Sequence, residues 1–568
     1  MPSPDRSGLP RLKTRTGCLT CKRVKCDEAK PHCMRCTSTG RKCDGYGSPP
    51  GPGARLTNRD LIHRPILMPS GNEREKRSFQ FFYERTVPSL AGYCGSNFWN
   101  RLVLQVSQHE KAVWHALIAL GSLHENFEND RNIPGLWFSR RGQDCFAVQE
   151  YLYAIRALLG SSSPGGVWSA NLPVGVCLIS CILFACFEVL SSHYDSAINH
   201  IRGGIKIMNE SYYDPRLGTF CHPHLKPSIV TGLEMGTLHK MLILLQDQAL
   251  VLTRDRIDQQ LAHSATFSEP YLNIPEIFSS VAEARDTFEY YRYKADRDFR
   301  DNAGTGPSCE TTAEFATLLR SYDPLIRKFC TTLHKFEHTR GERLSAREQI
   351  GLRILKIHQA MQRIRLEHAQ LRRTEQVSWD RFNPVFEEIV NLAAYVVDST
   401  HGVDCLSLSP SQLEQLSNTR HFKPSFTLDM GIIGPVYNVA TLCRDPFIRR
   451  KAVRVLHSAS RQEGCFNSHV CAVIAEQAIA IEETAALRIS PDSESVPLLQ
   501  TLSGLQLQDY QAGRITHCSE VPENARLLFV YPRVDPVEKK VYMRLSQRGV
   551  DVDVPLPAMA AMGDMMIS

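Results

Sequence analysis

Six of the nineteen cysteines in this 568-residue chain lie between positions 18 and 43. Their spacing is C-x2-C-x4-C-x6-C-x2-C-x6-C, formed by Cys18, Cys21, Cys26, Cys33, Cys36 and Cys43. Thiolates are soft ligands that suit tetrahedral zinc, and a C-x2-C pair can hold one ion from a single turn. About 30 residues cannot build an apolar core, so metal ligation would supply the free energy of folding. The spacing therefore predicts a metal site, against the alternative of six unligated thiols in a disordered tail.

The excess positive charge is concentrated in the same segment. Residues 1–46 hold eleven Lys and Arg against four Asp and Glu, whereas the rest of the chain holds 55 against 56. Such an asymmetry predicts a polyanionic partner for the N-terminal segment. The candidate contacts to phosphate or bases are Lys13, Arg15, Lys22, Arg23, Lys25, Arg41 and Lys42. Arg23 and Lys25 are the preferred candidates for base contacts, and the runs 11–15 and 22–25 are compatible with nuclear import.

The sequence around this segment favours an intracellular protein without a membrane span. Residues 1–16 are polar and contain no apolar stretch of the kind found in a secretory signal. The most apolar run, Val174–Leu190, has 17 residues, whereas a bilayer span takes about 20. We therefore expect a buried core helix there, and reduced thiols in the thirteen remaining cysteines.

Composition divides the chain into five predicted parts. A basic disordered arm (1–16) precedes the zinc-cluster domain (17–46), and a Gly/Pro-rich flexible linker (47–72) follows. A large helical domain (73–545) and a tail (546–568) complete the chain. The predicted fold class is mostly α, with a small zinc-stabilised cluster at the N-terminus.

Helical periodicity dominates the large domain. Ser345 and Glu348 have the spacing of a capping box, and an apolar stripe follows from Ile350 to Leu371. We expect this stripe to pack in the core of the domain rather than to form a zipper. Strand-like alternation is confined to 526–531 and 539–545, which are compatible with a C-terminal hairpin.

The cysteine segment resembles the DNA-binding module of the fungal binuclear zinc-cluster transcription factors. The resemblance rests on the six cysteines, on the run from Lys22 to Asp27, and on Lys30-Pro31. In that family, six cysteines hold two zinc ions, and the first and fourth cysteines bridge both ions. The resemblance implies one zinc on Cys18, Cys21, Cys26 and Cys33, and a second on Cys18, Cys33, Cys36 and Cys43. It also implies readout of CGG-type triplets in double-stranded DNA by basic residues between the second and third cysteines.

One spacing departs from the family pattern. Four residues separate Cys21 from Cys26, where the family has six. On a helix, two missing residues amount to about 200° of rotation and 3 Å of rise. Three explanations are open: the module tolerates a shorter loop, it has lost one zinc or its base readout, or the sequence is recorded with an error. In the second case, a single zinc on Cys18, Cys21, Cys33 and Cys36 is geometrically plausible.

The large domain also resembles the helical regulatory domain found in many members of this family. The similar motifs are Phe81–Pro88 with Phe98-Trp99, Ala116–Gly121, Phe187-Glu188 and His200–Gly204. The resemblance implies an effector or co-regulator bound by this domain, and the sequence leaves dimerisation open. The stretch Pro491–Tyr510 is a weak candidate for an activation segment.

Several other groups are expected to be structural. Cys221, His222 and His224 lack a nearby fourth ligand, and His193 and His200 share a helical face. Glu482 and Glu483 are expected on a solvated face of a helix. No nucleophile elbow, HExxH or dinucleotide motif is present, so an enzyme is not expected.

These observations predict a nuclear, sequence-specific DNA-binding regulator of transcription by RNA polymerase II. The alternative is an interaction protein of transcription whose shortened cluster no longer reads bases.

Overall fold

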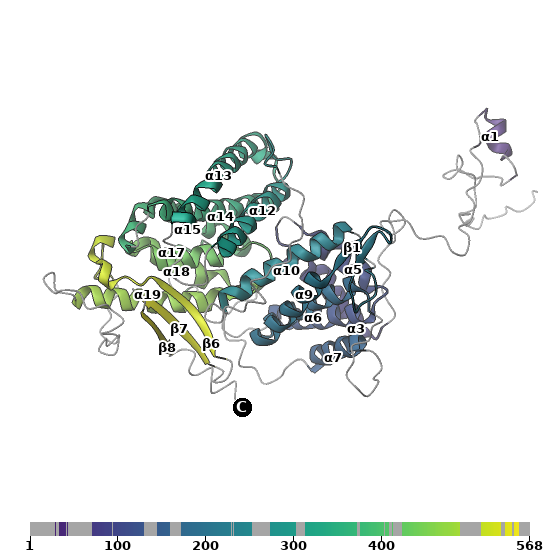
Figure 1. Ribbon diagram of the computed structural model, residues 1–568, viewed down its shortest axis with the longest axis horizontal. Coiled ribbons are helices and arrows are strands. Elements are labelled where there is room, and N and C mark those ends of the chain that lie inside the picture. The colour runs from purple at the N-terminus through teal and green to yellow at the C-terminus, as the bar shows by residue number, and fades with distance from the viewer. Residues whose placement is uncertain are drawn as a thin grey trace, which may run out of the picture. The chain divides into compact units, whose positions relative to one another are not determined.

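The computed structural model in Figure 1 divides into two compact units, Met1–Leu67 and Met68–Ser568. The structure describes residues 29, 33–40, 43, 71–93, 95–129, 145–159, 172–228, 230, 232–252, 273–302, 313–371, 375–402, 404–407, 412, 423–488, 513–535, 540–547 and 550–555. Helices predominate among the described residues, which confirms the mostly α fold class. Within the first unit the described residues include one short helix, α1 (Met34–Ser38).

The second unit begins with a group of helices around one apolar core. Its helices are α3 (Glu73–Phe81), α4 (Val87–Leu90), α5 (Val103–Ser107), α6 (Lys111–Asn129), α7 (Cys145–Leu159), α8 (Val174–Leu190), α9 (Tyr194–Glu210) and α10 (Gly232–Leu252). Two π-helical turns, η1 (Phe82–Thr86) and η2 (Phe98–Leu102), interrupt the path from α3 to α5. A two-stranded antiparallel ribbon, β1 (Tyr212–Asp214) and β2 (Thr219–Cys221), follows α9. Helix α8 has the bounds expected from the sequence and is buried along nearly its whole length, which confirms the core-helix interpretation.

Glycines set the closest helix contacts in this group. A Cβ added to Gly121 of α6 would lie 2.4 Å from the carbonyl oxygen of Ser78 in α3. A Cβ on Gly204 of α9 would lie 2.7 Å from a methyl carbon of Leu242 in α10. Both glycines belong to the short motifs that resemble the regulatory domain, so those motifs mark positions where two helices approach closely.

A second group of helices follows in the chain. It contains α12 (Val281–Asn302), α13 (Ala313–Arg340), α14 (Ala346–Gln370), α15 (Asn383–His401), α17 (Ile433–Leu442), α18 (Pro446–Ala459) and α19 (Ser468–Arg488), with 3-10 turns such as η6 (Gln376–Phe382) between them. The capping box predicted at Ser345 and Glu348 opens α14. Ile354, Ile357 and Met361 of the apolar stripe lie in a buried cluster with α15 and α17, which confirms core packing rather than a zipper.

Short strands join the two groups. β3 (Ser425–Thr427) pairs in parallel with β4 (Arg461–Glu463), which pairs antiparallel with β5 (Phe466–Asn467). Nearby, Arg285 of α12 donates to the carbonyl oxygen of Gly95 (3.2 Å) and pairs with Asp429 (3.3 Å). Arg347 of α14 donates to the carbonyl oxygen of Gly92. The turn before η2 is therefore held by side chains from two helices of the second group.

The predicted C-terminal hairpin is confirmed, and a third strand extends it. β6 (Phe529–Asp535) pairs antiparallel with β7 (Lys540–Gln547), which pairs antiparallel with β8 (Val550–Pro555). β6 continues past Pro532, beyond the end of the strand predicted from sequence, and β8 lies in the segment assigned to a tail. The buried side chains of this sheet, Met543 and Leu545, pack with α19 in an apolar cluster.

The expectation that Glu482 and Glu483 face solvent is wrong. Their side chains are 4% and 1% exposed, and both are paired with arginines. Glu482 accepts from Arg444 at 2.8 Å and from Arg449 at 2.9 Å, and Glu483 accepts from Arg449 at 2.5 Å and from Arg450 at 2.6 Å. The carboxylates therefore join α19 to the start of α18 inside the protein.

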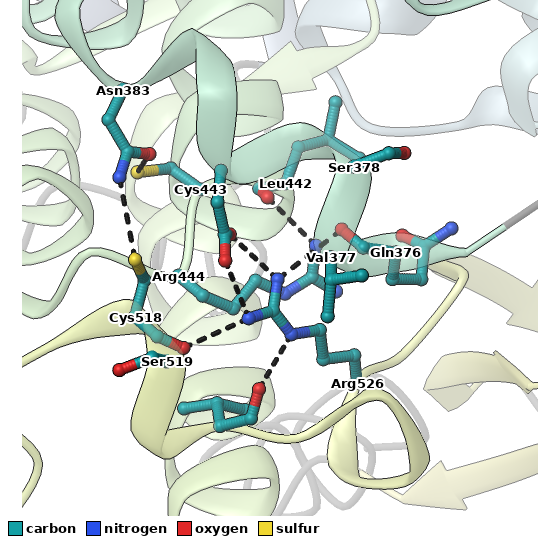
Figure 2. A network of polar contacts seen from close by, with 12 residues as sticks. Gln376, Val377, Ser378, Asn383, Leu442, Cys443, Arg444, Cys518, Ser519 and Arg526 are labelled. Carbon is teal, nitrogen blue, oxygen red and sulfur yellow. Dashed lines mark hydrogen bonds and ion pairs between the residues drawn. The ribbon is translucent and has the colours of Figure 1, made fainter. Parts of the chain in front are cut away.

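Arg526 forms a second buried contact point beside Arg444 (Figure 2). Its guanidinium binds both carboxylate oxygens of Asp380 in η6, at 2.7 and 2.8 Å. It also donates to the carbonyl oxygens of Gln376, Cys518 and Val521. All five N–H donors of Arg526 are thus used, and the segment before β6 is fixed to η6.

Among the described residues, the structure has no helix that combines the length and the apolar character needed to cross a bilayer.

Candidate metal centre

The structure describes half of the predicted cysteine ligands. Cys33, Cys36 and Cys43 are described, whereas Cys18, Cys21 and Cys26 lie outside the described residues. The predicted DNA contacts also lie outside them: Lys13, Arg15, Lys22, Arg23, Lys25, Arg41 and Lys42. The candidate activation stretch Pro491–Tyr510 lies outside them as well.

The three described thiols form one cluster. Their sulfur atoms all lie within 4.8 Å of one another, and the residues are 0%, 2% and 8% exposed. Among the described residues, no other group of three or more His, Cys, Asp or Glu side chains meets this geometry. The spacing C-x2-C-x6-C thus brings together the three side chains that it predicted.

Local hydrogen bonds place the first two sulfurs. Cys33 is the N-cap of α1, in an extended conformation (φ −70°, ψ 136°), and its Sγ accepts from the backbone N–H of Cys36 at 3.3 Å. An N-cap side chain satisfies an N–H at the start of a helix, where the partial positive charge also favours an anionic sulfur. The two sulfurs of the C-x2-C pair therefore lie on the same side of the first turn.

Cys43, which follows α1 in the chain, lies at the same place. α1 ends near Gly40, whose φ of +70° suits a residue without a Cβ. The backbone N–H of Cys33 then donates to Sγ of Cys43 at 3.4 Å. N–H···S bonds of this kind stabilise thiolate over thiol, because the sulfur accepts the hydrogen bond.

The donor set fits zinc. In a tetrahedral site with Zn–S bonds of about 2.3 Å, the sulfurs lie about 3.8 Å apart, within the limit found here. Met34, beside the cluster, is 68% exposed. Among the described residues of the first unit, the buried side chains are those of the three cysteines. Cys33, Cys36 and Cys43 would hold the metal, and the metal would supply structural cross-linking of this segment.

The other candidate metal ligands have structural partners, as expected. Nε2 of His222 lies 3.0 Å from the Glu210 carboxylate, and Nδ1 of His222 accepts from the backbone N–H of His224. His193 contacts Glu188 at 3.0 Å, and His200 contacts the hydroxyl of Tyr151 at 3.0 Å. Burial lowers the pKa of His200, whereas the hydrogen bond with Glu188 raises the pKa of His193.

One similar protein aligns with most of the chain, and two others align with part of it. The aspercryptin biosynthesis cluster-specific transcription regulator atnN of Emericella nidulans is 23% identical over 618 aligned residues, which cover 91% of this chain and 95% of the relative. The transcription regulator lscL of Purpureocillium lilacinum is 30% identical over 215 residues, 34% of this chain and 49% of the relative. The Zn(2)-C6 fungal-type transcription factor afumD of Aspergillus fumigatus is 33% identical over 129 residues, 20% of this chain and 34% of the relative.

The chain is thus similar to fungal zinc-cluster transcription regulators, and its group of three thiols fits their N-terminal cluster. No family model matches it, and no solved structure matches it. The similarity agrees with a cluster of buried thiols that precedes a large helical unit in the chain. The named relatives are transcription regulators, a class that generally lacks enzymatic activity.

Proposed function

We propose that this regulator acts in the nucleus, binds CGG-type sites in double-stranded DNA through its zinc cluster, and controls transcription by RNA polymerase II. The observation that carries the proposal is the group of three buried thiols within 4.8 Å, in a segment that holds the excess positive charge of the chain. A metal-stabilised basic module is a compact means of presenting cations to a groove of DNA. The helical unit would bind an effector or a co-regulator.

The full ligand set of the proposed cluster has six members. Cys18 and Cys33 would bridge two zinc ions, Cys21 and Cys26 would complete the first site, and Cys36 and Cys43 the second. Lys22, Arg23 and Lys25 would lie at the groove, with Arg23 or Lys25 on guanine. Lys13, Arg15, Arg41 and Lys42 would contact phosphates and add affinity without sequence preference.

The four-residue spacing between Cys21 and Cys26 supports the second candidate function. If this loop prevents Cys26 from reaching its metal and turns Lys25 away from the groove, the cluster holds one zinc and no longer reads bases. The protein would then act in transcription through partners of its helical unit. The two functions differ in zinc content and in sequence preference, so one experiment can separate them.

The test measures zinc per chain and DNA affinity for two proteins: the chain itself, and a variant with Ile-Arg inserted between Lys22 and Arg23. The insertion restores six residues between Cys21 and Cys26 without changing a ligand. Two zinc ions and preference for a CGG-containing duplex over a scrambled one in the unmodified chain support the first function. The second function is supported if the unmodified chain holds one zinc ion and shows no preference for the CGG-containing duplex, and if the variant gains both the second zinc ion and the preference.

The same duplexes distinguish base contacts from phosphate contacts. Lys25→Ala should relax the preference for CGG, by about 1–3 kcal/mol if the contact is bidentate. Lys13→Ala should weaken binding to CGG and scrambled duplexes alike. A Lys25→Ala protein with unchanged preference would contradict the proposed role of Lys25.

A further inference from the structure

Helix α13 carries a row of cations on its solvent-facing side. Arg320, Arg327, Lys328 and Lys335 are all exposed; Arg327 and Lys328 are adjacent, and Arg320 and Lys335 each lie seven or eight residues from this pair. At 3.6 residues a turn, these intervals keep the four side chains on one face, over about 22 Å of the helix axis. Arg343, in the turn after α13, is also exposed.

The opposite face of α13 is apolar and packed. Phe329, Leu333 and Phe336 lie in a buried cluster with side chains of α12 and α14. In Figure 1, α13 accordingly runs along the margin of the second helical group, with α12 and α14 beside it. The packing fixes the rotation of the helix, so the row of cations points away from the core.

One acid within the stretch of α13 that carries the row pairs with a cation of the row. Residues 320–335 are all described, and Asp323 is the one acidic residue among them; it pairs with Arg327 at 2.7 Å. Glu337, on the next turn, is paired instead with Lys356 of α14 at 3.0 Å. Residues 47–568 as a whole hold 55 basic and 56 acidic residues. The excess of basic over acidic residues on α13 is therefore local.

We propose that this face of α13 binds the phosphate backbone of the duplex held by the zinc cluster, in the DNA flanking the recognised element. This inference rests on the proposed function, which brings a duplex to the same chain. Cations that lie seven or eight residues apart on one helix face, about 10–12 Å along the axis, complement a regularly charged rod. A second copy of the chain would instead bring like charges against this face.

The covalent connection permits both contacts on one duplex. Twenty-nine peptide units separate Cys43 from Asn72, and they can span at most about 100 Å. That length equals about 30 base pairs of DNA, at 3.4 Å a pair. Once the zinc cluster is bound, the helical unit would meet the flanking DNA at a high effective concentration.

The experiment uses the full chain and a double substitution on the row, Lys328→Gln with Lys335→Gln. The matched control is Lys206→Gln with Lys240→Gln, two exposed lysines on α9 and α10 that give the same change in net charge. Each protein is titrated with a duplex of 16 base pairs that carries the element, and with one of 40 base pairs that adds flanks, over a range of salt concentrations. Circular dichroism verifies that the exposed substitutions leave the fold unchanged.

The unmodified chain should bind the longer duplex more tightly than the shorter one, and the row variant should lose this advantage. Removal of two phosphate contacts should reduce the slope of log K against log salt on the longer duplex by about 1.8, at about 0.9 per contact. At 0.1 M salt this corresponds to a loss of up to about 60-fold in affinity. The control variant should keep the affinity of the unmodified chain.

Equal slopes of log K against log salt for the row variant and the control on the longer duplex would overturn the inference. The charged face of α13 would then fit an acidic protein instead. Failure of the proposed function gives a different result, because the unmodified chain would then bind CGG and scrambled duplexes equally well. If α13 binds phosphates, the row variant would still show a reduced slope of log K against log salt on a scrambled duplex of 40 base pairs. Failure of the α13 inference can therefore be distinguished from failure of CGG-specific binding.

Discussion

At the scale of single residues, the buried ion pairs between α19 and the residues at the start of α18 are the contacts whose loss should cost the most free energy of folding. Arg444, Arg449, Glu482 and Glu483 have side chains between 0% and 4% exposed, and each is paired with an opposite charge. Burial alone would raise the pKa of Glu482, but Arg444 and Arg449 hold it below its usual value. Because the folded-state pKa is lowered, the contribution of Glu482 to stability is present at neutral pH and is lost as pH falls through that pKa.

We expect Glu482→Gln to destabilise the helical unit by about 3–5 kcal/mol, since the substitution leaves a buried arginine charge uncompensated. The measurement is the shift of the urea unfolding midpoint at neutral pH. The matched control is Glu387→Gln, which removes the partner of Lys451 in a pair whose side chains are 48% and 40% exposed, and should cost less than about 1 kcal/mol. The difference between Glu482→Gln and the unmodified chain should narrow on acidification; a constant difference would contradict the charged state assigned to Glu482.

At the scale of elements, the distance between helix axes in the first group depends on glycines, because a residue without a side chain lets two helices approach closely. Gly121 brings α6 against the backbone of α3, whereas a Cβ added to Gly203 in α9 would have no heavy atom within 4 Å. The two glycines are both helical, so an alanine at each has the same effect on backbone entropy. Only the packing around the new methyl group differs.

Gly121→Ala should therefore destabilise the helical unit by about 1–3 kcal/mol, because the methyl group would force α6 away from α3. Gly203→Ala should instead stabilise the unit by about 0.5–1 kcal/mol, the gain expected for alanine over glycine in an open helical position. Thermal unfolding of both variants gives the comparison. A stabilising effect of Gly121→Ala would mean that α3 and α6 can separate at little cost in free energy.

At the scale of the whole molecule, the metal centre and the helical unit are separate compact units. The cysteine group lies within Met1–Leu67, whereas the four apolar clusters lie between Phe79 and Val554. The two units therefore have independent sources of stability, metal ligation in the first and apolar burial in the second.

Zinc removal should accordingly abolish DNA binding and leave the thermal unfolding of the helical unit unchanged. The measurement pairs a DNA titration with far-ultraviolet circular dichroism, which reports helix content, before and after treatment of the full chain with a strong chelator. Restored zinc should restore binding. A lower unfolding temperature of the helical unit after chelation would show that the two units stabilise each other.

Local patterns in the sequence were enough to predict several parts of this molecule. The C-x2-C-x6-C spacing predicted the thiol group, the apolar run predicted α8 with its bounds, and Ser345 with Glu348 predicted the start of α14. Each of these features depends on residues a few positions apart, so spacing alone carries the information. The class of the protein followed from the same cysteines and from the motifs that resemble the regulatory domain.

The tertiary structure alone decided the features that depend on distant residues. The sequence around Glu482 predicts a surface residue, yet Arg444, 38 positions earlier, lies beside it, because the burial of a charge depends on where its partner lies in space. β8 lies in the segment that the sequence assigned to a tail, and its pairing with β7 makes it a strand. The spacing of the cations along α13 can be read from the sequence. That they face outward is decided by the packing of Phe329 and Phe336, because the rotation of a helix is fixed by the elements that cover its other side.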